Sequence, residues 1–222
     1  MKTFLIAASA LCAFAMPAVA ATLSGTFSVD IYQRTNATSA EARADAANLL
    51  AADTVFLETI TYTGQIDFGT RNMDDSTTIE DWLNTGVGGS FTPLSSTTAA
   101  LQLSRPNIRQ GSATVTFFDF TATFLSGFDS VIRHDDGITA YDDGVAYATR
   151  ANPTSVVNTN ATGFDGGDWR LLYAATNGDP SILKVTGSDL PDPFIAPVPL
   201  PAGLPLLLAG LGGLALLRRR AA

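Results

Sequence analysis

An alternating stretch near the start of the chain sets the main limit on the fold. From Thr22 to Gln33, apolar and polar side chains follow one another in turn, which is the pattern of a strand with one buried face. The apolar face carries Leu23, Gly25, Phe27, Val29 and Ile31. Because similar segments recur along the chain, the pattern predicts a fold built mainly from strands.

Further strands are expected at short intervals. The longest runs from Ser112 to Leu125, and its valine and phenylalanine side chains are expected to form the centre of the core. Another runs from Val55 to Phe68, with Gly64 as a bulge or turn. Shorter candidates are 130–133, 138–141, 145–149, 169–175 and 181–185. Short strands separated by Gly, Asp and Asn turns predict an all-β, jelly-roll-like β-sandwich in a single domain.

Two short peripheral helices are expected beside the sheets. Residues 39–52 are rich in helix-forming Ala, Glu, Arg and Leu, and this segment is predicted to lie over the sheet edge. The capping-box pattern from Thr77 to Glu80 predicts a second helix that ends at Gly86. Residues 87–98 are predicted to form a loop.

The N-terminal residues 1–20 have the features of a secretory signal peptide. Lys2 is followed by an apolar stretch, and Ala18-Val19-Ala20 provides a small-x-small cleavage site. Signal peptidase is therefore an expected partner, and the chain is expected to be exported. Cleavage would remove Cys12, the only cysteine, so that the core or bound ions must hold the mature domain together.

The C-terminal end has three parts in a fixed order. Val198-Pro199-Leu200-Pro201-Ala202 precedes a Leu/Ala/Gly run at 203–217, and three arginines follow at 218–220. The apolar run is shorter than the roughly 20 residues that span a bilayer without help. The arginines favour the cytoplasmic side. The tail therefore predicts a transmembrane anchor, with the domain outside the cytoplasm.

This tail closely resembles the VPLPA-CTERM form of the PEP-CTERM sorting domain. The resemblance implies recognition by an exosortase-type enzyme, cleavage near the motif, and only transient anchoring in the inner membrane. The final location would be the Gram-negative cell surface or extracellular matrix, where exopolysaccharide and biofilm are made. An ordinary tail anchor is the alternative. The predicted organisation is a signal peptide at 1–20, a β-sandwich at 21–187, a Pro-rich linker at 188–197 and the sorting segment at 198–222.

Removal of both ends makes the chain more acidic. Nine basic side chains then face twenty-one acidic ones, a net charge of −12 compared with −8 for the whole chain. This balance disfavours nucleic acid and anionic membrane surfaces as partners, and it is compatible with divalent cations.

Two Asp-Asp-Gly segments stand seven residues apart, and they are the strongest candidates for a site. The first follows His134 and comprises Asp135, Asp136 and Gly137; the second comprises Asp142, Asp143 and Gly144. Asp-Gly pairs are favoured in tight hairpins, so both segments could be turns alone. Adjacent carboxylates also repel each other, and a hard cation such as calcium would relieve that repulsion. The spacing leaves both interpretations open.

Residues 128–147 resemble the central hairpin of the protective-antigen-type β-sandwich, a lectin-like domain also present in yeast flocculins. Residues 169–183 resemble its late pair of strands. In the calcium-dependent members, the Asp-Asp pair forms a cis peptide and coordinates the ion that holds a sugar's hydroxyls. The resemblance therefore implies Asp135 and Asp136 as metal ligands. The residues expected to contact a ligand or complete the site are His134, Asp142, Asp143, Asn177 and Asp179.

The sequence contains no motif for nucleophilic catalysis or for phosphate or dinucleotide binding. It lacks a Gly-x-Ser-x-Gly elbow, and His134 is its only histidine. We therefore expect a non-enzymatic adhesion or matrix-binding module, with calcium as cofactor and surface polysaccharide as partner. Two alternatives remain: a structural surface protein without a ligand, and a polysaccharide-processing hydrolase, because two carboxylates suffice for glycoside hydrolysis.

Overall fold

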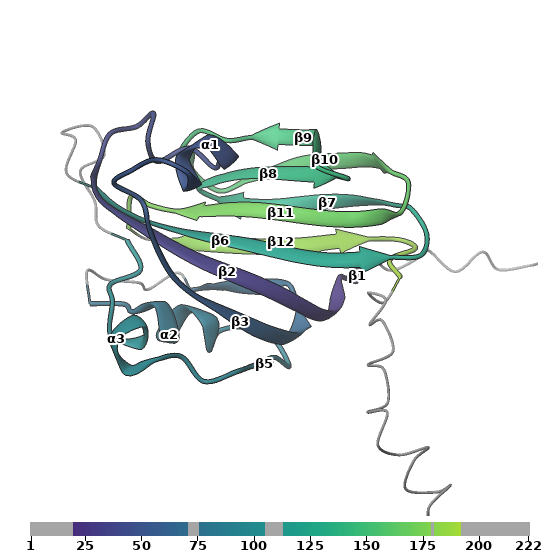
Figure 1. The fold of residues 1–222 in the computed structure, drawn as a ribbon. Helices are drawn as coiled ribbons and strands as arrows, with labels where there is room; N and C mark the ends of the chain where they lie inside the picture. Colours follow the sequence, from purple (N-terminus) through teal and green to yellow (C-terminus); the bar gives the residue numbers. More distant parts are fainter. Residues whose placement is uncertain (1–19, 71–75, 105–112, 179, 192–222) are drawn as a thin grey trace, which may run out of the picture.

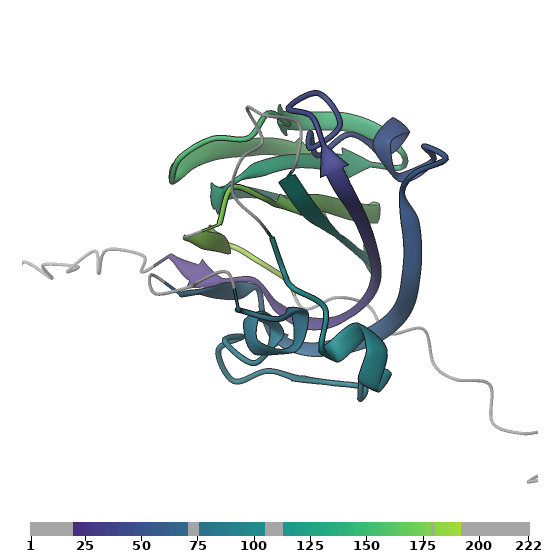
Figure 2. The same cartoon turned by 90° about the vertical axis from the view of Figure 1, so that its left-hand side faces the viewer.

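Two antiparallel sheets face each other and enclose the core (Figures 1 and 2). The larger has the order β5-β3-β2-β6-β11-β8-β9, and the smaller has the order β1-β12-β7-β10, with β4 also paired to β12. The larger sheet comprises β2 (Ser24–Ala37), β3 (Val55–Gln65), β5 (Ser90–Phe91), β6 (Ala113–Phe124), β8 (Gly137–Asp142), β9 (Val145–Arg150) and β11 (Gly167–Ala175). The smaller comprises β1 (Ala21–Thr22), β4 (Asp67–Thr70), β7 (Phe128–Asp135), β10 (Val157–Phe164) and β12 (Ser181–Gly187). The predicted all-β sandwich is confirmed.

The computed structural model describes residues 20–70, 76–104, 113–178 and 180–191. Nearly all of the predicted signal peptide, most of the linker, Asp179 and the sorting motif Val198–Ala202 lie outside these ranges. Within them, no helix has both the length and the apolar character needed to cross a membrane.

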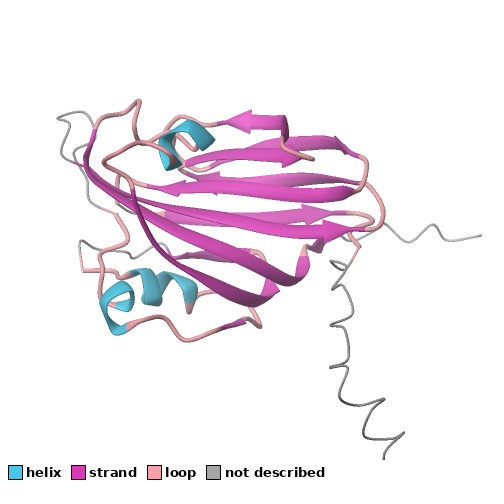
Figure 3. Cartoon of the chain, viewed as in Figure 1, coloured by secondary structure: helices cyan, strands magenta, loops and turns pink. Residues whose placement is uncertain are grey.

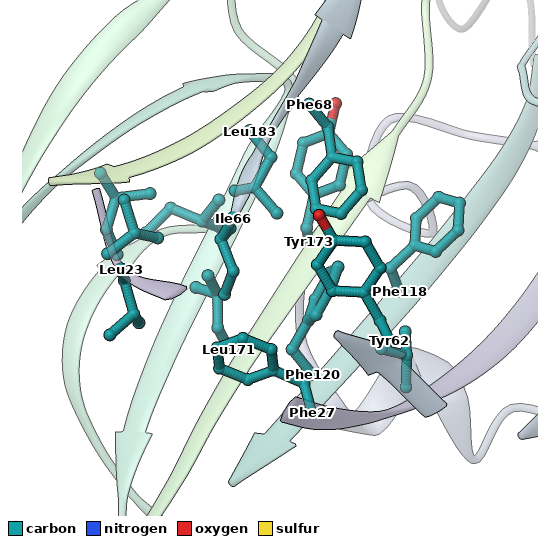
Figure 4. Close-up of a cluster of buried hydrophobic side chains, with 14 of the residues drawn as sticks. Leu23, Phe27, Tyr62, Ile66, Phe68, Phe118, Phe120, Leu171, Tyr173 and Leu183 are labelled. Carbon is teal, nitrogen blue, oxygen red and sulfur yellow. The ribbon is translucent and has the colours of Figure 1, made fainter. Parts of the chain in front are cut away.

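The core is built from aromatic side chains that both sheets and one short helix contribute. Phe68 from β4 and Phe118 from β6 stack on Trp82, with ring centroids 4.6 and 4.4 Å away. Tyr173 from β11 lies against the same indole at 5.5 Å, and Figure 4 shows the surrounding cluster. The indole Nε1 donates to the Ser181 carbonyl at 3.0 Å. The next residue, Ile182, pairs with Asp135 at the end of β7, so the core extends to the end of the sandwich where β7 passes into β8.

The predicted helices are present but shorter, and they lie at the periphery (Figure 3). The helix that carries Trp82 is α2 (Ile79–Leu83). Its capping box consists of Thr78 and Asp81, one residue later than predicted. The predicted loop at 87–98 contains β5 and a further helix, α3 (Ser96–Ala99).

The prediction of a helix over 39–52 was largely wrong. Only α1 (Ala46–Leu49) is α-helical, and Asp45 caps it. Before α1, Ala42 and Ala44 are both buried against β6 and β11, and the Ala44 N–H donates to the Ala151 carbonyl at 2.9 Å. The segment covers the outer face of the larger sheet rather than its edge. This cover explains why β6 is buried on both faces from Ala113 to Phe120.

The prediction missed one more strand and joined two others. β10 was missed: its sequence is mostly polar, and only Ala161 and Phe164 are buried. The strand predicted over 55–68 is divided, since β3 ends at Gln65 and β4 pairs with β12 in the other sheet. Gly64, with φ of 152°, immediately precedes this change of sheet.

Candidate functional site

The first Asp-Asp-Gly segment carries the chain from one sheet to the other. β7 pairs with β10 and β12 in the smaller sheet, whereas β8 pairs with β11 and β9 in the larger. The segment is therefore a turn between the two sheets and not a tight hairpin, because β7 and β8 are not paired with each other. The peptide bond between Asp135 and Asp136 is cis, as the resemblance implied.

The Asp136 carboxylate connects two loops at this end of the sandwich. Its Oδ1 accepts hydrogen bonds from the Thr154 N–H at 3.0 Å and from the Asn177 Nδ2 at 3.1 Å. Its Oδ2 accepts one from the Thr176 N–H at 3.0 Å. Asp136 has no exposed surface. Its burial, followed by the charge of Asp135, raises its pKa to about 8, and the three N–H donors only partly offset this rise.

Asp135 and His134 are held by hydrogen bonds to neighbouring groups. The Tyr173 hydroxyl donates to the Asp135 backbone carbonyl, and Asp135 is only 5% exposed. His134 is fully buried; its Nδ1 donates to the Asp136 carbonyl, and its Nε2 accepts from the Thr159 hydroxyl at 2.8 Å. Burial lowers the pKa of His134, which favours the neutral ring that this arrangement requires. The structure thus places His134 behind the turn, as a support.

Gly137 completes the turn because a side chain would not fit there. A Cβ atom at this position would lie 2.1 Å from the Ala151 carbonyl oxygen. The glycine therefore lets the loop after β9 approach the Asp135–Asp136 pair, and Thr154 of that loop reaches the Asp136 carboxylate.

The second Asp-Asp-Gly segment has a different role. It forms the tight β8–β9 hairpin, with positive φ at Asp143 (45°) and Gly144 (82°), as the turn prediction required. Asp142 and Asp143 accept N–H bonds from Asp165 and Asp168. Since β8 separates the two segments, they lie about 17 Å apart at ~3.3 Å per residue. Asp142 and Asp143 therefore do not join Asp135, Asp136 and Asn177 in one site.

The groups at this turn that could hold a hard cation are two carboxylates and one threonine hydroxyl. Among the described residues, no group of three or more His, Cys, Asp or Glu side chains is placed to hold a metal ion. Calcium would therefore need amide, hydroxyl or carbonyl oxygens besides the two carboxylates, and calcium accepts all of these. The Thr176 hydroxyl is buried next to Asp136's partner N–H, and it has no hydrogen-bond partner in the described part of the chain. A hydroxyl oxygen of this kind can coordinate calcium.

Sequence reasoning missed Thr154 and Thr176. Both act through backbone N–H groups, which every residue except proline carries, so no residue pattern could have identified them.

Comparison with known proteins gave likenesses of fold alone. No family model and no curated protein matches the chain. Among solved structures, a PA14 sugar-binding domain from an RTX adhesin is 16% identical, covering 73% of this chain and 88% of its own, with a TM-score of 0.47. The PA14 domain of the antifreeze protein MpAFP is 14% identical, covering 76% and 84%, with a TM-score of 0.48.

A third likeness is to the epithelial adhesin 6 A domain from Candida glabrata, solved in complex with Galβ1-3GlcNAc. It is 12% identical and covers 81% of this chain and 86% of its own, with a TM-score of 0.38. At TM-scores below 0.5, none of these likenesses assigns a function to this chain.

Proposed function

We propose that this protein is an exported, non-enzymatic adhesion module that binds glycan through a calcium ion held by Asp135 and Asp136. Its signal peptide and VPLPA-type tail would bring it to the cell surface or matrix through signal peptidase and an exosortase-type enzyme. When bound, calcium would supply positive charge to the two carboxylates and coordination positions for sugar hydroxyls.

The observation that carries this proposal is the burial of two consecutive carboxylates at one end of the sandwich. Asp135 is 5% exposed and Asp136 is 0% exposed. Burying adjacent negative charges is costly, and the pKa of Asp136, raised to about 8, reflects that cost. A divalent cation would offset both the desolvation and the repulsion.

A structural role without a ligand is the second candidate. The three N–H donors of Thr154, Thr176 and Asn177 already occupy both Asp136 oxygens, so the carboxylate could serve only to connect the two loops. We place no hydrolysis at this pair, because a general acid or base must contact the substrate directly. Asp136 has no exposed surface and would reach a sugar only through a bound cation.

Calcium titration of the full-length chain separates the two candidates. A cation that binds only the folded state stabilises it by RT ln(1 + [L]/Kd), about 2.7 kcal/mol at a concentration of 100 Kd. We expect thermal unfolding to shift upward with calcium in the wild type and in Asp143→Asn. The shift should be lost in Asp136→Asn.

Asp143→Asn is the matched control, because it makes the same charge change in the other Asp-Asp-Gly segment. If millimolar calcium leaves the wild-type melting curve unmoved, the calcium proposal fails and the structural role is favoured. If both variants lose the shift equally, calcium binds through general surface charge rather than at Asp136.

A further inference from the structure

A basic pocket lies beside the loop that contacts Asp136. It has a volume of about 490 Å³, and it is lined by Arg43 and by residues 149–154, including Arg150 and Asn152. Thr154 belongs to the pocket wall and also donates its N–H to the Asp136 carboxylate. The pocket and the candidate calcium site therefore share one loop.

The backbone positions of both arginines are fixed by the fold. The Arg43 carbonyl accepts from the Asn48 side chain at 2.9 Å, and the next residue, Ala44, donates to the Ala151 carbonyl at 2.9 Å. The Ala44 carbonyl in turn accepts from the Thr139 hydroxyl at 2.6 Å. Arg150 ends β9, where it pairs with Ile138 of β8. Two segments far apart in the sequence are thus joined so that each presents an arginine to the same pocket.

The charge of this pocket is unusual for the molecule. Of the basic residues in the described part of the chain, Arg34, Arg170 and Lys184 form ion pairs with acidic side chains. The other three are Arg43, Arg133 and Arg150, and none of them has an ion pair within the described residues. Two of these three line one pocket, in a chain whose net charge is −8.

We propose that the Arg43–Arg150 pocket binds the anionic group of an acidic saccharide, a carboxylate or a sulfate ester. Guanidinium groups bind both anions through paired, charge-assisted hydrogen bonds. Thr149 and Asn152 also line the pocket, and both are residue types whose side chains can hydrogen-bond sugar hydroxyls. This inference rests on the proposed glycan-binding function and narrows it, since the polymer recognised next to Asp136 would be an acidic polysaccharide.

Three monosaccharides with the same galactose-type ring test whether the pocket binds an anionic group. D-galactose is neutral, D-galacturonate carries a carboxylate at C6, and galactose 6-sulfate carries a sulfate ester there. Binding to the full-length chain, in calcium, is measured by NMR titration. We expect at least one anionic sugar to bind at least tenfold more tightly than galactose, and the stronger of the two identifies the preferred anion.

Arginine variants provide the matched controls. Arg43→Gln with Arg150→Gln should abolish the preference for the anionic sugar, whereas Arg133→Gln should retain it. Arg133 is exposed on β7, lies outside the pocket and also has no ion pair among the described residues. Thermal unfolding checks that each variant is folded. An equal affinity for all three sugars would overturn the inference, as would the same loss in Arg133→Gln.

The calcium site and the pocket can fail separately. Arginine-dependent binding of galacturonate that persists in EDTA, without any calcium-dependent binding of galactose, would support the pocket and contradict the calcium proposal. Calcium-dependent binding of galactose with no preference for either anionic sugar would support the calcium site and overturn the pocket.

Discussion

The two Asp-Asp-Gly segments have the same three residues and opposite surroundings. Residues 135–137 cross between the sheets, and Asp136 is fully buried among N–H donors from two loops. Residues 142–144 close a hairpin in which Asp143 and Gly144 are exposed. The glycines differ as well: Gly144 supplies a positive φ, whereas Gly137 supplies space for the Ala151 carbonyl.

This difference shows that the residues of a short motif do not by themselves determine the burial or the pKa of its carboxylates. Asp-Gly favours a turn in both places, but only the first turn is covered by other parts of the chain. Burial raises the pKa of Asp136. A bound cation would stabilise the buried negative charge, which a surface carboxylate does not need.

The largest expected difference between the segments is in how the stability that each contributes depends on pH. The Asp136 pKa of about 8 in the folded, metal-free protein exceeds the unfolded value of roughly 3.9, so the folded state binds this proton more tightly. The stability that this group contributes is fully present below about pH 4 and is lost as pH rises through about 8. The loss is on the order of several kcal/mol, because one pKa unit corresponds to about 1.4 kcal/mol.

Urea unfolding in EDTA at a series of pH values measures this effect. Asp136→Asn should remove the slope, and Asp143→Asn should keep it. If the free energy of unfolding changes with pH in the same way for the wild type and Asp136→Asn, the pKa of Asp136 is no more shifted than that of a surface carboxylate.

A smaller difference is expected between the two glycines. Gly137→Ala should cost about 3 kcal/mol, because its Cβ would overlap a backbone carbonyl that is itself tied to Ala44. Gly144→Ala meets nothing within 4 Å and should cost about 1 kcal/mol, from the left-handed φ alone. Denaturant unfolding compares the two, and equal costs would contradict the close approach at Gly137.

The smallest difference concerns single side-chain hydrogen bonds. Asn177→Gly tolerates the positive φ of 63° and removes the side chain whose Nδ2 donates to Asp136, so it should cost about 1 kcal/mol. Asp143→Asn keeps an acceptor for the Asp168 N–H and should stay within about 0.5 kcal/mol of the wild type. An Asn177→Gly variant as stable as the wild type would mean that this amide does not support the Asp136 carboxylate.

Much of the fold could be predicted where side-chain patterns are strong. The alternation over 22–33 and the aromatic run in 112–125 correspond to β2 and β6, and both lie in the larger sheet. The prediction was poor where packing overrides propensity. The segment around Ala42 is rich in helix formers, yet contacts with β6 and Ala151 hold most of it in another conformation.

The candidate site, like the fold, has a part that could be predicted from the sequence and a part that could not. Residue types and spacing marked both Asp-Asp-Gly segments as candidates, and the resemblance selected Asp135 and Asp136. Asn177 was proposed as a further site residue without an aligned position. Thr154, Arg43 and Arg150 could not be found, because these loop and strand-end residues come together only when β8 pairs with β9 and the 39–45 segment packs beside Ala151.

By itself the sequence determined the class of the fold, the positions of the main strands and the two aspartate pairs, because alternation and turn chemistry act between near neighbours. Only the tertiary structure decided which pair is buried and which is a simple hairpin turn. Burial, carboxylate pKa and the proximity of the two arginines depend on contacts between segments about a hundred residues apart, such as Ala44 and Ala151. Patterns among near neighbours in the sequence contain no information about those contacts.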